Sequence, residues 1–180
     1  MEAVHNLEKT VAEWYKGLPH LPKELRTWLG TNVWWIVIVG VVLSVFAAFA
    51  AISALLIILG LGGLGAGLGA RYGYGYGAAV SASIGVAWLW SLVALAGLVV
   101  TLILMLMAIN PLKAKAKRGW TLLFVVLLVN IAVGVVQGLG GFNIASIFFA
   151  LLWGAVEGYF LFEIRDQFGK APAKVEAAKK

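Results

Sequence analysis

Long continuous runs of apolar residues dominate the pattern of the chain. They lie at about 33–59, 88–109, 120–138 and 142–164, and the first three contain no charged residue. About 20 consecutive apolar residues are enough for an α-helix to cross the hydrocarbon of a bilayer. The strands of a transmembrane barrel would instead alternate apolar and polar residues over about ten positions. The pattern therefore predicts four membrane-spanning helices and no barrel.

The N-terminal segment, residues 1–30, has a different pattern. The sequence predicts an amphipathic helix over residues 2–18, and Pro19 and Pro22 then interrupt it before a short helix over 23–29. This helix either lies on the membrane surface or packs on the loops of the bundle, and both interpretations stay open. The residues that recur at helical spacing on its apolar face are Val4, Leu7, Val11, Trp14 and Leu18.

The ends of the predicted spans have their own signals. Asn110-Pro111 is expected to end the second span, because the residue before a proline is biased away from helix. Residues 138–143 form a short turn between the third and fourth spans. Residues 60–87 are rich in Gly, Ala and Tyr, and they form either an outer hairpin or a segment that dips back into the bilayer. Residues 166–180 form a polar, Lys-rich tail.

The predicted fold is therefore an all-α, polytopic transmembrane four-helix bundle over residues 31–165, preceded by the N-terminal amphipathic segment. Its orientation follows from the positive-inside rule. With the N-terminus inside, 13 of the 14 Lys and Arg residues fall in inside segments, and Arg71 alone falls outside. We expect a multi-pass protein of the plasma or inner membrane with both termini in the cytoplasm.

Composition supports this placement and narrows the function. The chain is 62% apolar and 12% charged, whereas a soluble domain has about 45–50% and about 25%. Its net charge of +6 comes from basic residues at the ends of apolar runs, which argues against nucleic acid as a partner. There is no cysteine, and the two histidines, His5 and His20, lie in the N-terminal segment. No catalytic set, metal-ligand spacing or cofactor motif is present, so we expect neither an enzyme nor a bound metal or cofactor.

Three stretches of the sequence resemble a known group of proteins. The stretches are Leu21-Pro22-Lys23, the run from Ile109 through the Lys113–Arg118 loop to Phe124, and Gly158–Arg165. They resemble a family of uncharacterised small bacterial membrane proteins with four spans. The resemblance implies the four-span layout and a bacterial inner-membrane setting, and it carries over no functional residue. Glu157 and the Tyr-Gly repeat have no counterpart in the family pattern.

Three polar side chains within the spans form a candidate intramembrane site: Glu157, Asn130 and Gln137. A carboxylate in hydrocarbon is costly, so we expect Glu157 to face the bundle interior or a water cavity. It then either hydrogen-bonds to a neighbouring helix, most simply through Asn130, or carries a proton or cation. Asn130 and Gln137 are more typical of hydrogen bonds between packed helices.

Charged residues also gather where the spans end. Glu163, Arg165 and Asp166 are expected to reach the headgroups by snorkelling from the inner end of the fourth span. The basic loop between the second and third spans is expected to contact anionic lipid headgroups. Its basic residues are Lys113, Lys115, Lys117 and Arg118.

The segment after the first span contains two further motifs. Its glycines include the small-xxx-small pairs Gly63/Gly67 and Gly65/Gly69, which favour close helix packing and self-association. The following Gly-Tyr-Gly repeat is similar to a potassium selectivity filter, although the preceding Thr-Val is absent. The alternative for this outer loop is a set of tyrosines at the headgroup level. The residues of this loop are Arg71, Tyr72, Tyr74 and Tyr76.

These observations support two functions of different classes. The first is a non-catalytic scaffold or accessory subunit of a membrane assembly, which binds a membrane protein partner or a further copy of itself. The second is a channel or transporter subunit that uses Glu157 with Asn130, or the Tyr-Gly outer loop. The near-absence of ionisable groups within the spans favours the first function.

Overall fold

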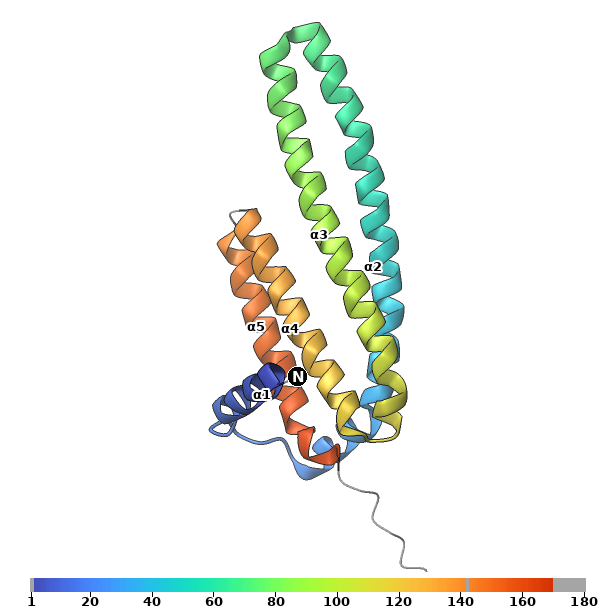
Figure 1. Ribbon diagram of the computed structural model, residues 1–180, viewed down its shortest axis with the longest axis vertical. Helices are drawn as coiled ribbons and strands as arrows, with labels where there is room; N and C mark the ends of the chain where they lie inside the picture. The colour runs from blue at the N-terminus through green and yellow to red at the C-terminus, as the bar shows by residue number, and fades with distance from the viewer. Residues whose placement is uncertain (1, 142, 170–180) are drawn as a thin grey trace, which may run out of the picture. The chain divides into compact units, whose positions relative to one another are not determined.

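The computed structural model describes residues 2–141 and 143–169 and consists of helices and short connections. Helix α1 covers Glu2–Tyr15, α2 covers Lys23–Tyr72, α3 covers Tyr74–Lys113, α4 covers Lys117–Gly140 and α5 covers Ile144–Glu163. A 3-10 turn, η1, covers Arg165–Gln167. Figure 1 shows that α2 with α3, and α4 with α5, form two antiparallel hairpins.

The all-α fold with four long apolar helices is confirmed. By length and composition, each of the four can cross a membrane, over Lys23–Leu61, Ile84–Lys113, Lys117–Gly140 and Ile144–Gln167. The first three predicted spans lie inside these helices, and the fourth helix begins at residue 144, two residues after the predicted start at 142, which falls outside the described part. The chain is therefore a multi-pass membrane protein. The N-terminal helix is also present, but it ends at Tyr15, before the first of the two prolines.

Helices α2 and α3 are longer than predicted. The first span continues without interruption through the Gly-rich run, so that α2 has 50 residues and extends about 75 Å. The short helix predicted over 23–29 is the beginning of the same element. Only Gly73, with φ 104°, separates α2 from α3, and this is a conformation that glycine adopts without strain. Residues 60–87 are therefore a helical hairpin around Gly73.

The prediction that Asn110-Pro111 ends the second span was wrong by one turn. Helix α3 continues to Lys113, because proline keeps a helical φ and only its missing N–H weakens the turn. The stop is a Schellman motif instead. The N–H of Ala116 donates to the carbonyl of Pro111, the N–H of Lys115 donates to that of Leu112, and Lys115 takes the left-handed conformation at φ 49°.

The chain divides into two compact units, and every long helix contributes to both. Unit 1 comprises residues 1–40, 103–128 and 152–180, and unit 2 comprises residues 41–102 and 129–151. Buried apolar side chains lie almost entirely in unit 1, around Leu112, Trp120, Phe124 and Ile164. Among the described residues of unit 2, Leu55 and Thr101 are the buried side chains.

Unit 2 is held together by close backbone approach. A Cβ at Gly97 of α3 would lie 2.6 Å from Val133 of α4, and one at Gly134 of α4 would lie 2.6 Å from Ala150 of α5. Gly140, the last residue of α4, packs directly on the ring of Trp90. These three glycines let the helices of unit 2 touch.

The glycines of the predicted small-xxx-small pairs differ from these three. A Cβ at Gly67 would meet no atom of the described chain within 4 Å. Gly69 is half-buried, and its carbonyl accepts a hydrogen bond from the N–H of Gly73 at 3.1 Å, which belongs to the end of α2 rather than to a contact with another helix. The surroundings of Gly63 and Gly65 lie outside the described part. The predicted role of Gly67 and Gly69 in helix packing therefore stays a prediction about a further copy or a partner.

The contact between Gly140 and Trp90 also marks where α4 ends along α3. The 16 residues of α3 before Trp90 continue past this point, a distance of about 24 Å. The corresponding part of α2 lies on the other side of Gly73, from about Ile57 onward. We call residues 57–89 the hairpin tip.

Candidate functional site

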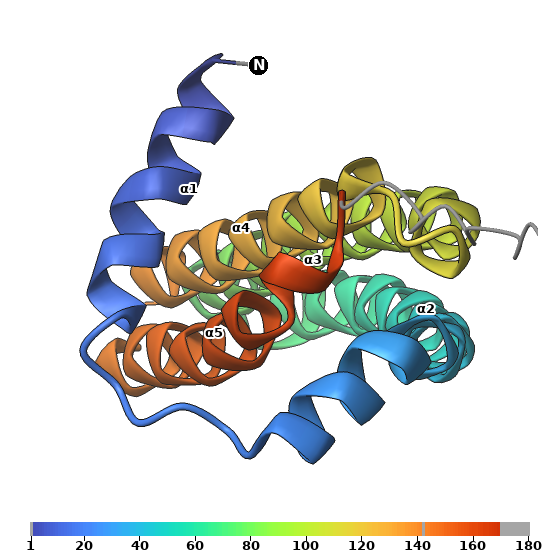
Figure 2. The same cartoon turned by 90° about the horizontal axis from the view of Figure 1, so that it is seen from below.

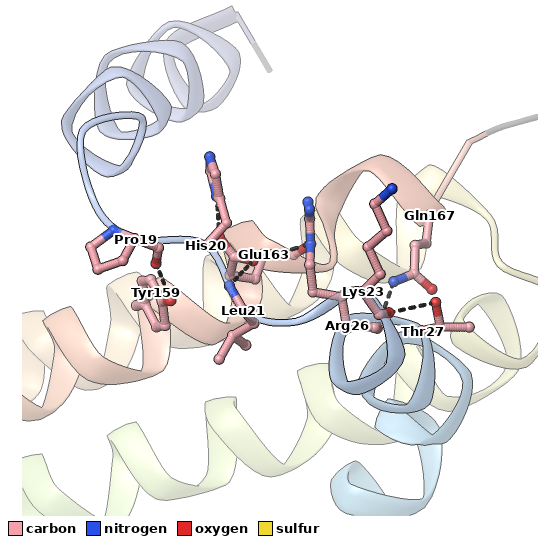
Figure 3. Close-up of polar contacts among 9 residues, drawn as sticks. All are labelled: Pro19, His20, Leu21, Lys23, Arg26, Thr27, Tyr159, Glu163 and Gln167. Carbon is pink, nitrogen blue, oxygen red and sulfur yellow. Dashed lines mark hydrogen bonds and ion pairs between the residues drawn. The ribbon is translucent and has the colours of Figure 1, made fainter.

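A polar cluster in unit 1 is the most developed site of the described chain, and Glu163 is at its centre. Its side chain is only 6% exposed, although Glu163 is the last residue of α5. His20 Nδ1 lies 2.7 Å from Oε1, the Leu21 N–H donates to Oε2 at 3.1 Å, and Arg26 Nε is 3.1 Å from Oε2 (Figure 3). Both carboxylate oxygens therefore have partners from the segment between α1 and α2.

Further hydrogen bonds fasten this connecting segment to α5 and η1. The Tyr159 hydroxyl donates to the Pro19 carbonyl at 2.6 Å, and Gln167 Nε2 donates to the Arg26 carbonyl at 2.6 Å (Figure 3). Pro19 and Pro22 cannot donate backbone hydrogen bonds, and a proline favours an extended conformation in the residue before it. Both properties suit a connecting segment that lies along α5 without being helical itself. The contact of Gln167 with α2 is close, since a Cβ at Gly30 would overlap its amide.

A second buried acid, Glu8, fastens α1. Its side chain is 3% exposed, and Lys117 Nζ and Arg165 Nη2 both lie 2.7 Å from Oε1. Burial by itself raises the pKa of Glu8, but the hydrogen bonds and charges of Lys117 and Arg165 outweigh it and hold the pKa below its ordinary value. Glu8 is therefore ionised at neutral pH and joins α1 to the ends of α4 and α5.

Tyr15 makes the other contact of α1. Its hydroxyl donates to the Ala155 carbonyl at 2.9 Å, and its ring stacks on Phe162 with centroids 5.2 Å apart. The ring lies over Gly158, where a Cβ would be 2.5 Å from the hydroxyl oxygen. Burial raises the pKa of Tyr15, so the hydroxyl remains a donor.

The apolar residues Leu7 and Trp14 of α1 lie on a different side of the helix from the residues that contact the bundle. Leu7 and Trp14 are about 100° around the helix from Glu8 and Tyr15, and Trp14 is 72% exposed. Figures 1 and 2 show that α1 crosses the direction of α5 rather than following it. One side of α1 is thus attached to the bundle while an adjacent side is free and apolar. The contacts of Glu8 and Tyr15 show that α1 packs on the bundle, and its position on the membrane surface stays a prediction.

Trp120 lies beneath the cluster and has no exposed surface. Its indole N–H donates to the Leu161 carbonyl at 2.7 Å, and its ring stacks on Phe124 with centroids 5.6 Å apart. Lys117 Nζ, which pairs with Glu8, also lies 4.0 Å from the centroid of the Trp120 ring. The indole supplies a partner for one of the last carbonyls of α5, which the helix itself leaves free.

This arrangement is suited to holding elements of the fold together. Within the described residues, every buried side-chain nitrogen or oxygen has a hydrogen-bond partner. The same residues contain no group of three or more His, Asp or Glu side chains that could hold a metal ion. Glu163 and Glu8 are saturated by bases and N–H groups, so the cluster is a clamp.

The predicted intramembrane site is distributed differently from expectation. Glu157 is exposed on α5 rather than turned inward, with the indole of Trp153, one turn earlier, within hydrogen-bonding reach. Asn130 is part of unit 2, where its Oδ1 accepts a hydrogen bond from Thr101 at 3.0 Å. Gln137 is half-buried near the end of α4. The hydrogen bond of Asn130 is therefore of the helix-packing kind.

The outer segment adopts helical structure. Tyr72 ends α2 with Arg71 in its last turn, and Tyr74 and Tyr76 begin α3. A selectivity filter needs an extended strand of carbonyls facing a pore, and a helix directs its carbonyls along its own axis. The carbonyl of Gly69, just before this segment, is already engaged by the N–H of Gly73 and is not free to face a pore.

Several basic side chains of the loop between α3 and α4 contact other residues of the protein. Lys117 pairs with Glu8, and Lys113 Nζ lies 4.5 Å from the ring centroid of Trp34. Lys115 Nζ is 3.4 Å from the Thr31 hydroxyl, and Arg118 is exposed. Three of these four cations therefore have intramolecular neighbours.

The important acids of the clamp, Glu8 and Glu163, were not identified as site residues from the sequence. Glu163 was expected to snorkel, but it is buried. The partners of the two acids lie 109 to 157 positions away along the chain. No local pattern in the sequence indicates these distant partners.

Comparison with known proteins gives no match, whether with protein-family models, curated proteins or solved structures. The geometry of the chain itself therefore carries the functional argument.

Proposed function

We propose that this membrane protein is a non-catalytic scaffold or accessory subunit that holds a partner protein through its hairpin tip, residues 57–89. The observation that carries this proposal is the mismatch in helix length within the chain. Helices α4 and α5 have 24 and 20 residues, close to the 20 that cross about 30 Å of hydrocarbon. Helices α2 and α3 continue about 24 Å past the end of α4.

Several of the described side chains of the hairpin tip are apolar and exposed. Ile57, Leu59, Leu61 and Leu64 are exposed, and Leu64 has 63% of its surface free. No Lys, Arg, Asp or Glu occurs in residues 57–89 apart from Arg71. Exposed apolar side chains that gather in one region typically mark a protein interface. The partner we propose is the apolar surface of another membrane protein.

The glycines of the hairpin tip fit this role. A Cβ at Gly60 or Gly67 would meet no atom of the described chain within 4 Å. Such bare backbone lets a second helix approach closely, and packing of this kind drives helix association in membranes. A second copy of this chain would use the same surface.

The experiment is photo-crosslinking in native membranes. A photoreactive residue replaces Leu64 in one variant and Phe46 in the matched control, since both are strongly exposed apolar residues of α2. We expect a protein adduct at position 64 and lipid adducts at position 46. A protein adduct of doubled chain mass would identify self-association. Lipid adducts alone at both positions would contradict the proposal.

We further propose that both termini are cytoplasmic and that the membrane is a bacterial inner membrane. The support is the distribution of Lys and Arg, which leaves Arg71 alone at the opposite end. Lys113, Lys115 and Arg118 would then meet anionic headgroups of the inner leaflet. A reporter after Lys180 should be active only inside, and a tag beside Gly73 should react only from outside. The reverse result would contradict this orientation.

Transport is a second candidate, and one observation favours it. Glu157 lies on an exposed apolar face of α5 with Trp153, Val156 and Phe160, about 9 Å along the helix from Glu163. An acid in such a place is typical of ion and proton pathways formed with a neighbouring subunit. The protein is tested in liposomes, where Glu157→Gln should abolish a pH-driven flux. Equal flux with and without the substitution would remove this candidate.

A further inference from the structure

A hollow of about 300 Å³ lies beside the clamp in unit 1 and shares Arg26, Glu163 and Gln167 with it. Its lining residues are Lys23, Arg26 and Thr27 from the start of α2, and Glu163, Asp166 and Gln167 from the end of α5 and η1. The lining carries two bases and two acids, so its formal charge is zero. A ligand with a large net charge would gain little from such a lining, whereas a zwitterion would match it.

The charges of the hollow are not all matched internally. Arg26 uses its Nε on Glu163, and its two terminal nitrogens remain for a ligand. Neither the ammonium of Lys23 nor the carboxylate of Asp166 has a hydrogen-bond or ion-pair partner in residues 2–141 and 143–169. Figure 3 shows the side chains of Lys23 and Arg26 extending in the same direction from α2. Lys23 and Arg26 thus attract an anion, and Asp166 attracts a cation.

A second hollow, of about 500 Å³, adjoins the first and shares Lys23 and Thr27 with it. The acid Glu24 lines it together with Trp28, Thr31 and Asn32, and Trp28 is 56% exposed. The same face of α2 continues through the exposed residues Trp35 and Val39 into the apolar span. A polar hollow therefore leads along one helix face to an apolar surface.

We propose that this pair of hollows binds one phospholipid whose headgroup carries a phosphate and a primary ammonium, as in phosphatidylethanolamine. The phosphate lies between Lys23 and Arg26, and the ammonium donates hydrogen bonds to Asp166. The glycerol region contacts the hydroxyl and amide groups of Thr31 and Asn32. The acyl chains follow Trp35 and Val39 into the bilayer.

The chemistry of the site discriminates among common phospholipids. A quaternary ammonium, as in phosphatidylcholine, has no N–H to donate to Asp166. A phosphatidylglycerol headgroup leaves Asp166 without a cation, and it brings its anion to a pair of hollows that together hold two bases and three acids. The position of the hollow at the end of the apolar α2 face favours the membrane lipid over a soluble phosphoethanolamine.

The test is native mass spectrometry of the full chain in detergent, titrated with palmitoyl-oleoyl forms of phosphatidylethanolamine, phosphatidylcholine and phosphatidylglycerol. We expect the first phosphatidylethanolamine to bind with a dissociation constant about fivefold lower than those of the other two lipids. One charge interaction near the surface gives a difference of this size. Equal retention of all three lipids, or a preference for phosphatidylglycerol, would overturn the proposal.

Two variants separate the two ends of the site. Asp166→Asn should remove the preference for the ethanolamine lipid and leave the binding of phosphatidylcholine unchanged. Lys23→Gln should weaken all three lipids about fivefold. The matched controls are Glu13→Gln and Lys9→Gln, which replace exposed charges on α1 outside both hollows. An ethanolamine preference that survives Asp166→Asn would refute the assignment of the ammonium.

A competition experiment distinguishes the lipid from a soluble ligand. Phosphoethanolamine carries the same two charges without acyl chains, so a tenfold excess should leave the bound lipid in place. Displacement of the lipid by this excess would overturn the lipid assignment. All variants should show the far-ultraviolet circular dichroism of the unsubstituted protein, because the side chains of Lys23 and Asp166 are exposed and make no hydrogen bond or ion pair within the described residues.

Discussion

The two units of the bundle use the same four helices but are stabilised by different kinds of contact. Unit 1 contains Trp120 with no exposed surface and two acids held by ion pairs. Among the described residues, unit 2 has one buried apolar side chain, Leu55, and its helices touch mainly at glycines. Unit 1 therefore supplies its own core, whereas unit 2 leaves most of its apolar surface to the bilayer and to a partner.

The two ends of each long helix therefore contribute differently to the protein: one end lies in the core of unit 1, and the other lies in unit 2 and leaves a face free. Side-chain packing and satisfied polar groups give unit 1 a single arrangement that does not depend on its surroundings. Glycine contacts bring backbones together but leave the outward faces free. The following predictions test this division, from the largest effect to the smallest.

Removal of the Trp120 side chain should have the largest effect. The substitution Trp120→Ala deletes a fully buried ring and the hydrogen bond to Leu161, so we expect a loss of about 3–5 kcal/mol in the free energy of unfolding. Unfolding of the purified protein by a denaturing detergent measures it. The control is Phe46→Ala in unit 2, where the ring is exposed and the expected change is within about 0.5 kcal/mol. Similar losses at both positions would show that unit 1 has no separate core.

Unit 2 should be sensitive at glycines instead. Gly97→Ala places a methyl group 2.6 Å from Val133, whose branched side chain has little rotamer freedom in a helix. We expect a destabilisation of about 1–3 kcal/mol by the same unfolding measurement. Gly85→Ala is the control on the same helix, because nothing lies within 4 Å of its Cβ position. If both glycines tolerated the methyl group equally, close helix contact would not be what stabilises unit 2.

The clamp of α1 should respond to pH through Glu8. Because the folded-state pKa of Glu8 is below its ordinary value of 4.5, its contribution is complete at neutral pH and is lost as the pH falls through the folded pKa. Glu8→Gln should cost about 1–2 kcal/mol at pH 7, since its basic partners are themselves partly exposed. Proteolysis of α1, followed from pH 7 to pH 3, should become faster with acid in the unsubstituted protein. In Glu8→Gln, proteolysis of α1 should be fast over the whole pH range. If proteolysis of this variant still became faster with acid, Glu8 would be excluded as the origin of the pH response.

These long-range ion pairs are the part of the molecule that the sequence could not predict. The four spans followed from hydrophobic run length, because a bilayer imposes one requirement on every spanning helix. The burial of Glu163 depends on His20 and Arg26, more than 130 positions away, and no local pattern indicates which distant base will meet a given acid. The continuation of α2 through its glycines was also missed, since glycine weakens a helix in water but is common in membrane helices.

The smallest effect should be at Gly67. In the purified protein, Gly67→Ala should stabilise α2 by about 0.5–1 kcal/mol, because its Cβ position is open and alanine favours helix. In native membranes the same methyl group should reduce crosslinking from position 64, because it occupies the surface that a partner helix approaches. A gain in stability without any change in crosslinking would place the partner elsewhere.

Hydrogen–deuterium exchange, compared between native membranes and detergent micelles, shows whether a partner covers the hairpin tip. We expect equal protection of the unit 1 helices in both, and protection of residues 57–89 that is strong in native membranes and much weaker in micelles. Equal protection of the hairpin tip in both environments would contradict the claim that a partner covers it.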